Sequence, residues 1–280
     1  MKRLLLPLVF LAGVALALSS VALAEEEQSD PKTTAIAWVD SNVATLNRVN
    51  RNIWGWAETG LEEVKSSKEL QDLLRANGFA VESGVADMPT AFTATFGTGS
   101  PVIGILAEFD ALPGLSQDAS AERKSRPEVM AGHGCGHSVF GTASTGAAIA
   151  IKQALAAGTI KGTVKLFGTP AEETGIGKTY MLREGIFKGV DTILAWHAGD
   201  RTAAAWDYSK AMVSVKFRFE GLPSHASVSP ERGRSALDAV ELMSVGVNYM
   251  REHVKEDTRI HYVITNGGGQ PNVVPPNAEV

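Results

Sequence analysis

The chain has 280 residues, a formal net charge of −5 and a pI near 5.7. This acidic balance leaves no basic surface of the kind that binds nucleic acid, and no basic amphipathic helix indicates membrane-surface binding. Hydrophobic residues make up 44% of the sequence, which is enough for a packed core in one large domain or two ordinary ones. We therefore expect a globular protein without a nucleic-acid partner.

The first 24 residues have the pattern of a secretory signal peptide. Lys2 and Arg3 precede an apolar run over residues 4–18, and Ala22-Leu23-Ala24 matches the small-x-small pattern of a cleavage site. The run is short for a membrane-spanning helix, and the cleavage pattern follows it directly. We expect a mature chain that begins at Glu25, is exported to the periplasm or secreted, and is not inserted in the membrane. An uncleaved N-terminal anchor is the alternative.

Between residues 34 and 208, helical and strand-like patterns alternate. Residues 34–77 have a helical pattern that is interrupted near Gly60, which predicts two helices. Short apolar runs predict strands, and small or apolar residues at helical spacing predict further helices. The strands are expected at residues 79–82, 91–96, 102–107, 164–167 and 192–196, and the helices at 141–157 and 178–184. The alternation predicts an α/β domain, with a mainly parallel sheet covered by helices on both faces.

The pattern changes after residue 208. Alternating apolar and polar residues predict a half-buried strand over 213–219, and an apolar stripe predicts a helix over 236–254. Two more strands, at 259–265 and from 278 onward, are expected on either side of the turn-rich GGGQPN. This order of elements forms most of a ferredoxin-like domain. We therefore assign residues 25–208 to one domain and residues 209–280 to a second, incomplete α+β domain.

Polar side chains follow three of the predicted buried strands. Glu108 and Asp110 follow the strand at 102–107, Glu172 and Glu173 follow the next, and His197 follows the third. Open α/β sheets bind their ligands at the carboxyl ends of parallel strands, so we expect these side chains to meet. Taken singly, each has a simpler reading: a solvated acidic pair for Glu172 and Glu173, a turn residue for Asp110, and a core or surface histidine for His197.

The segment GHGCGH, residues 132–137, contains two histidines and the only cysteine of the chain. Gly134 and Gly136 allow the tight turn that would bring Cys135 and His137 to the same centre. A thiolate, imidazoles and carboxylates together suit a borderline-soft divalent metal, with zinc or manganese as the leading choices. The adjacent Glu172 and Glu173 would then have different roles: one would bind metal, and the other would take a proton from the attacking water.

Three other interpretations of Cys135 remain open. A lone cysteine is often a small buried apolar residue. It could instead be a nucleophile activated by His133 or His137, which would leave the glutamates and His197 without a role. A closed structural zinc site is the third, although such a site favours four Cys or His ligands without spare carboxylates.

Several separated motifs resemble the M20 metallopeptidases and amidohydrolases, and within them the B-type branch of the aminobenzoyl-glutamate hydrolases. They are LAEFDALPG, GHGCGHSVFG, TPAEETGIGK and the strand end at His197, in that order. The segment GLPSHASVSPERGRSALDAV resembles the dimerisation domain inserted in that family, and the similarity covers nearly all of residues 35–280. The resemblance implies a zinc-exopeptidase-like fold, a homodimer, and hydrolysis of amide bonds in N-acyl amino acids or aminobenzoyl-glutamate-like substrates.

The resemblance also implies roles for individual residues. Glu172 would be the general base, Asp110 would orient a ligand, and the ligands of a centre with two zinc or manganese ions would be Cys135, His137, Glu173 and His197. His225 is similar to a family histidine that reaches the partner subunit's active site and stabilises the developing oxyanion, and Asn272 to a second residue that crosses to bind substrate. For His225 the simpler reading is a loop residue ahead of a helix.

The sequence departs from the family at two places. Ser138 stands where the amidohydrolases often have aspartate, which bears on substrate preference. Members of the family also continue well beyond residue 280 and supply one more metal-binding histidine there. The alternative expectation is therefore a truncated fragment that folds or associates but has no catalytic activity.

Overall fold

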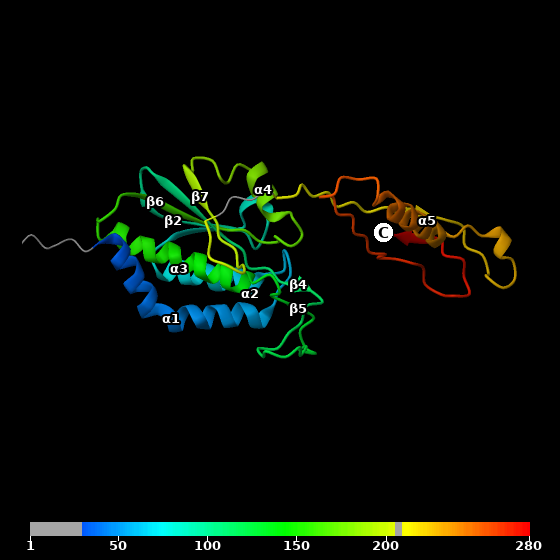
Figure 1. Ribbon diagram of the computed structural model, residues 1–280, viewed down its shortest axis with the longest axis horizontal. Coiled ribbons are helices and arrows are strands. Elements are labelled where there is room, and N and C mark those ends of the chain that lie inside the picture. Colours follow the sequence, from blue (N-terminus) through cyan, green and yellow to red (C-terminus); the bar gives the residue numbers. More distant parts are fainter. Residues whose placement is uncertain (1–29, 205–208) are drawn as a thin grey trace, which may run out of the picture. The chain divides into compact units, whose positions relative to one another are not determined.

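The computed structural model describes residues 30–204 and 209–280, so the expected signal peptide lies outside the described residues. The chain divides into two compact units, of which the first ends at Ala204. Figure 1 shows the elements of each unit. Within the described ranges, no helix has the length and apolar character needed to cross a membrane.

The first unit is built on a five-stranded sheet with the strand order β1-β2-β6-β3-β7. The strands are β1 (Ala80–Ser83), β2 (Phe92–Thr98), β3 (Val102–Ala107), β6 (Gly162–Gly168) and β7 (Thr192–Leu194). β3 pairs in parallel with β6 and with β7, whereas β2 is antiparallel to both β1 and β6. Four strands therefore run in one direction and β2 runs against them, which confirms the prediction of a mainly parallel α/β sheet.

The register of β3 and β6 determines where the polar loops emerge. Ala107 is paired with Gly168 at the carboxyl ends of the two strands, so the segments that follow them start side by side. The Thr169 N–H continues the contact by donating to the Ala107 carbonyl at 2.8 Å. A small hairpin of β4 (Leu112–Pro113) and β5 (Ala131–Gly132) then leads into the GHGCGH segment.

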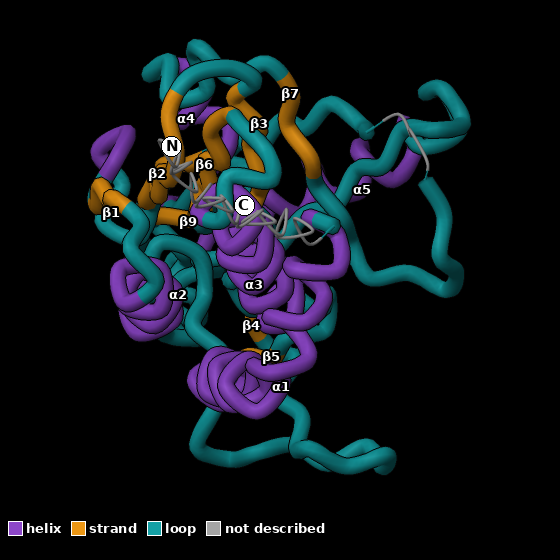
Figure 2. The backbone as a smooth tube through the Cα atoms, turned by 90° about the vertical axis from the view of Figure 1, so that its left-hand side faces the viewer, coloured by secondary structure: helices purple, strands orange, loops and turns teal. Residues whose placement is uncertain are grey.

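The helices α2 (Val64–Ala76) and α3 (His137–Ala156) cover one face of the sheet, and α1 (Pro31–Trp56) packs against these two helices (Figure 2). The Asp30 carboxylate caps α1 through the Thr33 N–H, and the Glu58 carboxylate accepts from the Lys65 and Ser66 N–H groups in the first turn of α2. The break between α1 and α2 confirms the interruption predicted near Gly60. Their apolar faces pack with the sheet in one core that includes Ile53, Leu74, Ile149 and Leu166.

The opposite face is covered by α4 (Gly177–Arg183), the 3-10 turn at Val85–Asp87 and the segment 186–190. Phe167 and Met181 form this second core, and neither is exposed to solvent. Leu166 and Phe167 are neighbours in β6 and point to opposite faces, as strand geometry requires. Figure 2 shows the sheet between α4 and the helices α2 and α3 of the same unit.

The expectation of a buried strand at 192–196 is wrong in two respects. Only Thr192–Leu194 is a strand, and it pairs with β3 alone at the end of the strand order. Its side chains are solvent-accessible: Ile193 is 40% and Leu194 is 54% exposed. A continuous apolar run predicts burial on both faces, but an edge strand buries less of its surface than a central one.

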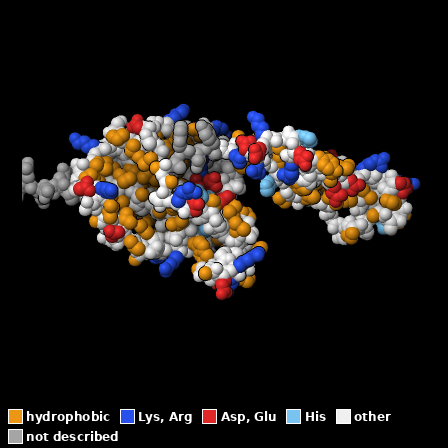
Figure 3. All heavy atoms as spheres, in the orientation of Figure 1, with side chains coloured by type: hydrophobic (Ala, Val, Ile, Leu, Met, Phe, Trp, Pro, Cys, Tyr) orange, Lys and Arg blue, Asp and Glu red, His pale blue; other side chains and the backbone are white. Residues whose placement is uncertain are grey.

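The second unit contains α5 (Ala236–Met250) packed on two antiparallel strands, β8 (Arg218–Glu220) and β9 (Asn277–Glu279). Ser235 caps α5 by accepting from the Asp238 N–H, and the small core includes Val240 and Ala278. Other side chains of α5 are open to solvent, among them Leu242 and Tyr249, each 74% exposed. Figure 3 shows apolar and acidic side chains next to each other on this unit.

Two strand predictions for the second unit need correction. The strand expected at 259–265 does not form, because only an isolated bridge between Asn266 and Glu279 is present instead of a ladder. The Ile260 carbonyl oxygen accepts a hydrogen bond from the Arg251 guanidinium at 2.5 Å. It therefore pairs with a side chain and not with the backbone of a neighbouring strand. The strand expected at 213–219 is reduced to Arg218–Glu220, because its partner β9 is three residues long.

Replacing Leu74 by alanine is expected to destabilise the first unit by about 2–5 kcal/mol, because this fully buried side chain would leave a cavity in the helix-covered core. Leu182→Ala is the matched control, since Leu182 is 68% exposed and its loss should change stability by no more than about 0.5 kcal/mol. Denaturant unfolding of both variants measures the difference. Equal effects would contradict the assignment of the core.

Candidate metal centre

The GHGCGH segment brings Cys135 and His137 to the edge of the sheet. α3 begins at His137, and Gly136 before it has a φ of +84°, a conformation that strains any residue with a side chain. At Gly134 an added Cβ would lie 2.8 Å from Cδ1 of Leu115. Gly136 is therefore required by its backbone conformation, whereas a side chain at Gly134 would only displace the end of the exposed Leu115 side chain.

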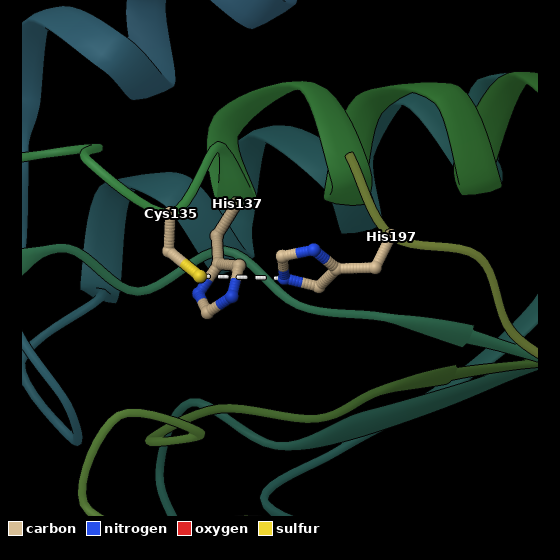
Figure 4. A group of neighbouring side chains, drawn as sticks. All are labelled: Cys135, His137 and His197. Atoms are coloured by element: carbon tan, nitrogen blue, oxygen red, sulfur yellow. Dashed lines mark hydrogen bonds between the residues drawn. The ribbon is translucent and has the colours of Figure 1, made fainter. Parts of the chain in front are cut away.

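Cys135, His137 and His197 point toward one another (Figure 4). Cys135 Sγ lies 3.3 Å from His197 Nε2, and one ligand atom from each of the three residues falls within 4.8 Å of the others. They come from the loop before α3, the first turn of α3 and the segment after β7. A thiolate and two imidazoles at this spacing could bind a single zinc-like ion.

His137 is fully buried, and its two nitrogens have different surroundings. Nδ1 donates to Asp110 Oδ1 at 2.9 Å, whereas Nε2 has no hydrogen-bond partner. An imidazole that donates one N–H to a carboxylate and leaves the other nitrogen free is the usual form of a metal-binding histidine. His137 therefore presents Nε2 to the centre.

The two adjacent glutamates reach the same place from the loop after β6. The Glu173 N–H donates to Asp110 Oδ2 at 2.9 Å, and Glu173 Oε1 lies 3.8 Å from His137 Nδ1. Glu172 Oε2 lies 3.9 Å from His137 Nε2. Asp110 thus contacts both the imidazole and the glutamate loop, and the structure brings six of the predicted site residues together.

Glu108 is a further member of the cluster to which the sequence assigned no role. It lies two residues before Asp110, is 6% exposed, and has Oε2 3.1 Å from His137 Nε2. Its other oxygen accepts from Lys178 Nζ at 2.6 Å. Glu108, His137 and Glu172 form a second group with the spacing of metal ligands. Its position after a buried strand was visible in the sequence, but the contact with Lys178 was not.

The local electrostatics favour a bound cation. Burial and the nearby Glu173 and Glu172 carboxylates raise the pKa of Cys135 to about 11. Burial also raises the pKa of Glu173. For His137, burial acts to lower the pKa, but the hydrogen bond to Asp110 and the charge of Glu108 raise it overall. Negative charges crowded in a partly buried site disfavour each other, and a divalent cation would offset that repulsion.

A second, independent observation also indicates that these residues suit a metal ion. Three buried polar atoms of the cluster have no hydrogen-bond partner: Glu108 Oε2, His137 Nε2 and Glu173 Oε1. Buried polar atoms are nearly always paired, so unpaired ones grouped around His137 need an explanation. A cation between Glu108 Oε2 and His137 Nε2, which lie 3.1 Å apart, would satisfy both of these atoms. Glu173 Oε1 lies on the other side of the imidazole, 3.8 Å from Nδ1.

Glu63 is a residue that the sequence did not single out. It is fully buried, and its carboxylate accepts from the Ala171 N–H at 2.8 Å and from the Thr90 hydroxyl at 2.9 Å. Ala171 has a φ of +54°, a strained conformation for a residue other than glycine, and it directly precedes Glu172. Glu63 on one side and Asp110 on the other therefore hold the backbone on either side of Glu172.

The remaining histidines have other surroundings. His133 Nε2 lies 3.1 Å from the Ile53 carbonyl, and burial lowers the pKa of His133 to about 4. His225 and Asn272 belong to the second unit, where the Ala226 N–H donates to the Asn272 carbonyl at 2.9 Å. His225 is exposed, and its Nδ1 lies 3.2 Å from the Ser227 hydroxyl oxygen.

A mainly parallel α/β sheet with carboxylates, imidazoles and a thiolate at its strand ends is typical of metal-dependent hydrolases. The family model for peptidase family M20/M25/M40 matches residues 104–276, and the chain belongs to this family. It is 47% identical over 230 residues to the B-type subunit of p-aminobenzoyl-glutamate hydrolase from Escherichia coli (strain K12). That match covers 81% of this chain and 48% of the relative, so the chain spans about half the relative's length.

Solved structures support the fold. An aminobenzoyl-glutamate utilization protein from Klebsiella pneumoniae is similar with a TM-score of 0.60 at 20% identity, over 88% of this chain and 67% of that one. A dinuclear metal-binding peptidase of family M20 from Bacillus subtilis has a TM-score of 0.55 at 22% identity, over 86% and 63%. These likenesses confirm the α/β architecture expected from the sequence.

The buried Glu63 predicts a pH dependence of stability. Burial raises its pKa from 4.5 to about 7, so the folded state keeps a proton that the unfolded chain has released. The free energy of unfolding should therefore fall as pH rises between these two values, by up to about 3 kcal/mol. Glu63→Gln stays neutral and should flatten this slope, which denaturant unfolding at about pH 5 and about pH 8 measures.

Glu62→Gln is the matched control for this experiment, because Glu62 is the exposed neighbour in the same connection. In Glu62→Gln the free energy of unfolding should fall with rising pH as it does in wild type. If Glu63→Gln and wild type lose stability equally across the window, Glu63 is ionised at the same pH in the folded and unfolded states, and the prediction is wrong.

Proposed function

We propose that this protein is a metal-dependent amide hydrolase. The observation that supports the proposal most strongly is the cluster at the strand ends, where buried atoms of Glu108, His137 and Glu173 lack hydrogen-bond partners. Membership of the M20/M25/M40 family agrees with this chemistry. The substrate would be an N-acyl amino acid or an aminobenzoyl-glutamate-like amide, as the name of the Escherichia coli relative suggests.

Within this proposal the cofactor is two divalent ions, either zinc or manganese, held by Cys135, His137, Glu173 and His197. Bound ions would polarise the scissile carbonyl and lower the pKa of water. Asp110 keeps Nδ1 of His137 protonated and so turns Nε2 toward the centre. The same carboxylate orders the loop of Glu173 through that residue's N–H.

Glu172 is the proposed general base. Its side chain is 38% exposed, and among the described residues no hydrogen bond holds its carboxylate, so the carboxylate can meet water and substrate. It would take a proton from the water that attacks the scissile carbonyl carbon, and later give that proton to the leaving amine. The backbone on both sides of Glu172 is held by Glu63 and Asp110, which limits the positions of its carboxylate.

A cysteine nucleophile is the second candidate, because Cys135 Sγ lies 3.3 Å from His197 Nε2. A nucleophilic cysteine needs a lowered pKa, however, and burial with nearby carboxylates raises that of Cys135 to about 11. The nearest imidazole is also His197, whereas the sequence suggested His133 or His137 as the activating base. The electrostatics therefore favour the metal-dependent reaction.

The second unit has its own proposed role. Exposed apolar side chains of α5, such as Leu242 and Tyr249, support association into a homodimer through residues 209–280. His225 and Asn272 would then act in the partner subunit's site, on the oxyanion and the substrate respectively. If the metal centre needs a ligand outside this chain, the fragment alternative holds, and the chain folds or associates without turnover.

The pattern of residues 1–24 supports export, with the mature protein in the periplasm or secreted. This proposal concerns the location of the protein and is independent of the proposed catalytic activity. Cleavage after Ala24 would be seen directly as a mature N-terminus at Glu25.

Glu172→Ala is expected to lower kcat for p-aminobenzoyl-glutamate by about 10²–10⁴-fold while the bound metal stays unchanged, because the variant loses a proton acceptor and no ligand. Steady-state kinetics and metal analysis of the same sample test both parts. Glu184→Ala, at the exposed end of α4, is the control and should keep wild-type turnover. Turnover that survives in Glu172→Ala would remove Glu172 as the base.

A further inference from the structure

Glu108 has a contact that the proposed function does not yet explain. Its Oε2 lies 3.1 Å from His137 Nε2, yet neither atom has a hydrogen-bond partner. Both side chains are more than nine-tenths buried, Glu108 at 6% and His137 at 0% exposure. Two buried polar atoms therefore approach each other without the geometry of a hydrogen bond.

The contacts of His137 leave Nε2 without a hydrogen-bond partner. Nδ1 lies 2.9 Å from Asp110 Oδ1, whereas Nε2 and Glu108 Oε2 are 3.1 Å apart without the angles of a hydrogen bond. Two buried polar atoms that approach this closely need a third group to satisfy them. A cation between the two atoms would do so.

Lys178 determines the direction of the Glu108 carboxylate. Its ammonium donates to Oε1 at 2.6 Å, so only Oε2 is free to face His137. Lys178 comes from α4 and Glu108 from the end of β3, so the pair connects the two sides of the centre. The ion pair with Lys178 satisfies Oε1 of Glu108. It would leave Oε2 of the same carboxylate buried without any partner.

We propose that Glu108 is a further ligand of the metal centre, binding through Oε2, and that Lys178 is the residue that positions it. Ligand atoms lie about 2.0–2.2 Å from zinc, which places two ligands of one ion about 3–3.5 Å apart. The distance between Glu108 Oε2 and His137 Nε2 falls in this range. Glu108 and His137 would then hold one ion, with Glu172 beside it as the proposed base, and Cys135 and His197 would approach the other.

This inference rests on the proposed metal centre, and it adds a carboxylate to the ligands expected from the sequence. It also gives Lys178 a role distinct from substrate binding. With one oxygen paired to an ammonium, Glu108 would be a weaker donor than a free carboxylate, and Lys178 would offset part of the negative charge near His137.

Metal binding by the whole chain tests the inference without an activity measurement. Manganese titration by calorimetry, with elemental analysis after dialysis, should give two ions for wild type. Glu108→Gln keeps the shape of the side chain, and should lose one ion or bind it more than about 100-fold more weakly. Lys178→Met should keep both ions with affinity reduced by about 10–100-fold, as expected for a residue that orients a ligand.

Glu184→Gln is the control, because this exposed carboxylate pairs with Arg183 outside the cluster, and it should bind manganese as wild type does. Two ions held with wild-type affinity by Glu108→Gln would overturn the inference and leave the proposed hydrolase intact. A folded wild-type chain that binds no manganese or zinc would overturn both.

A direct observation on wild type covers the case in which Glu108→Gln does not fold. Crystals soaked in manganese should show an anomalous-difference peak about 2.2 Å from Glu108 Oε2. A peak at the cluster that lies more than about 3 Å from this oxygen would show that Glu108 pairs only with Lys178, and the inference would be wrong.

Discussion

The hydrogen bond from His137 Nδ1 to Asp110 joins the parts of the candidate site that lie far apart in the sequence. Asp110 follows β3, His137 begins α3, and the second oxygen of Asp110 accepts from the backbone of Glu173 after β6. One buried carboxylate thus aligns an imidazole and a glutamate loop at the same strand ends. Without this alignment, His137 Nε2 would not face the centre and Glu173 would lack a fixed backbone.

The cluster combines several destabilising features, and they have a common physical origin. Glu173 and Cys135 both have pKa values raised by burial, and Ala171 is strained. Buried atoms of Glu108 and Glu173 lack hydrogen-bond partners. Such features are expected where a protein keeps negative charges in place for a cation instead of satisfying them internally. The surrounding core, packed on both faces of the sheet, provides the stability that holds them there.

Local sequence patterns were sufficient to predict those parts of the structure that depend on residues close together in the sequence. The strand Val102–Ala107 has the bounds expected from its apolar run, and the position of Asp110 beyond its end followed directly. The turn at Gly136 was also predictable, because only glycine adopts its backbone conformation without strain. Residues placed by long-range packing were missed. Glu63 holds a backbone group 108 positions away, and Lys178 contacts Glu108 across 70 positions, contacts for which periodicity gives no signal.

The strand predictions show the same limit. An apolar run indicates a strand but not its number of neighbours, so residues 192–196 were expected in the interior although β7 is an edge strand. Residues 259–265 have strand-like composition, yet a strand exists only where a partner forms a ladder with it. The alternation of strands and helices predicted the α/β class, because that signal is repeated along the first unit and does not depend on any single element.

The metal content of the purified chain, produced as residues 25–280, tests the central claim most directly. Elemental mass spectrometry on protein shown to be folded by circular dichroism should find about two tightly held zinc or manganese ions per chain. That result would show that the cluster around His137 assembles a metal centre from the residues of this chain. A folded chain without metal would contradict the account, and would mean that these ligands are insufficient on their own.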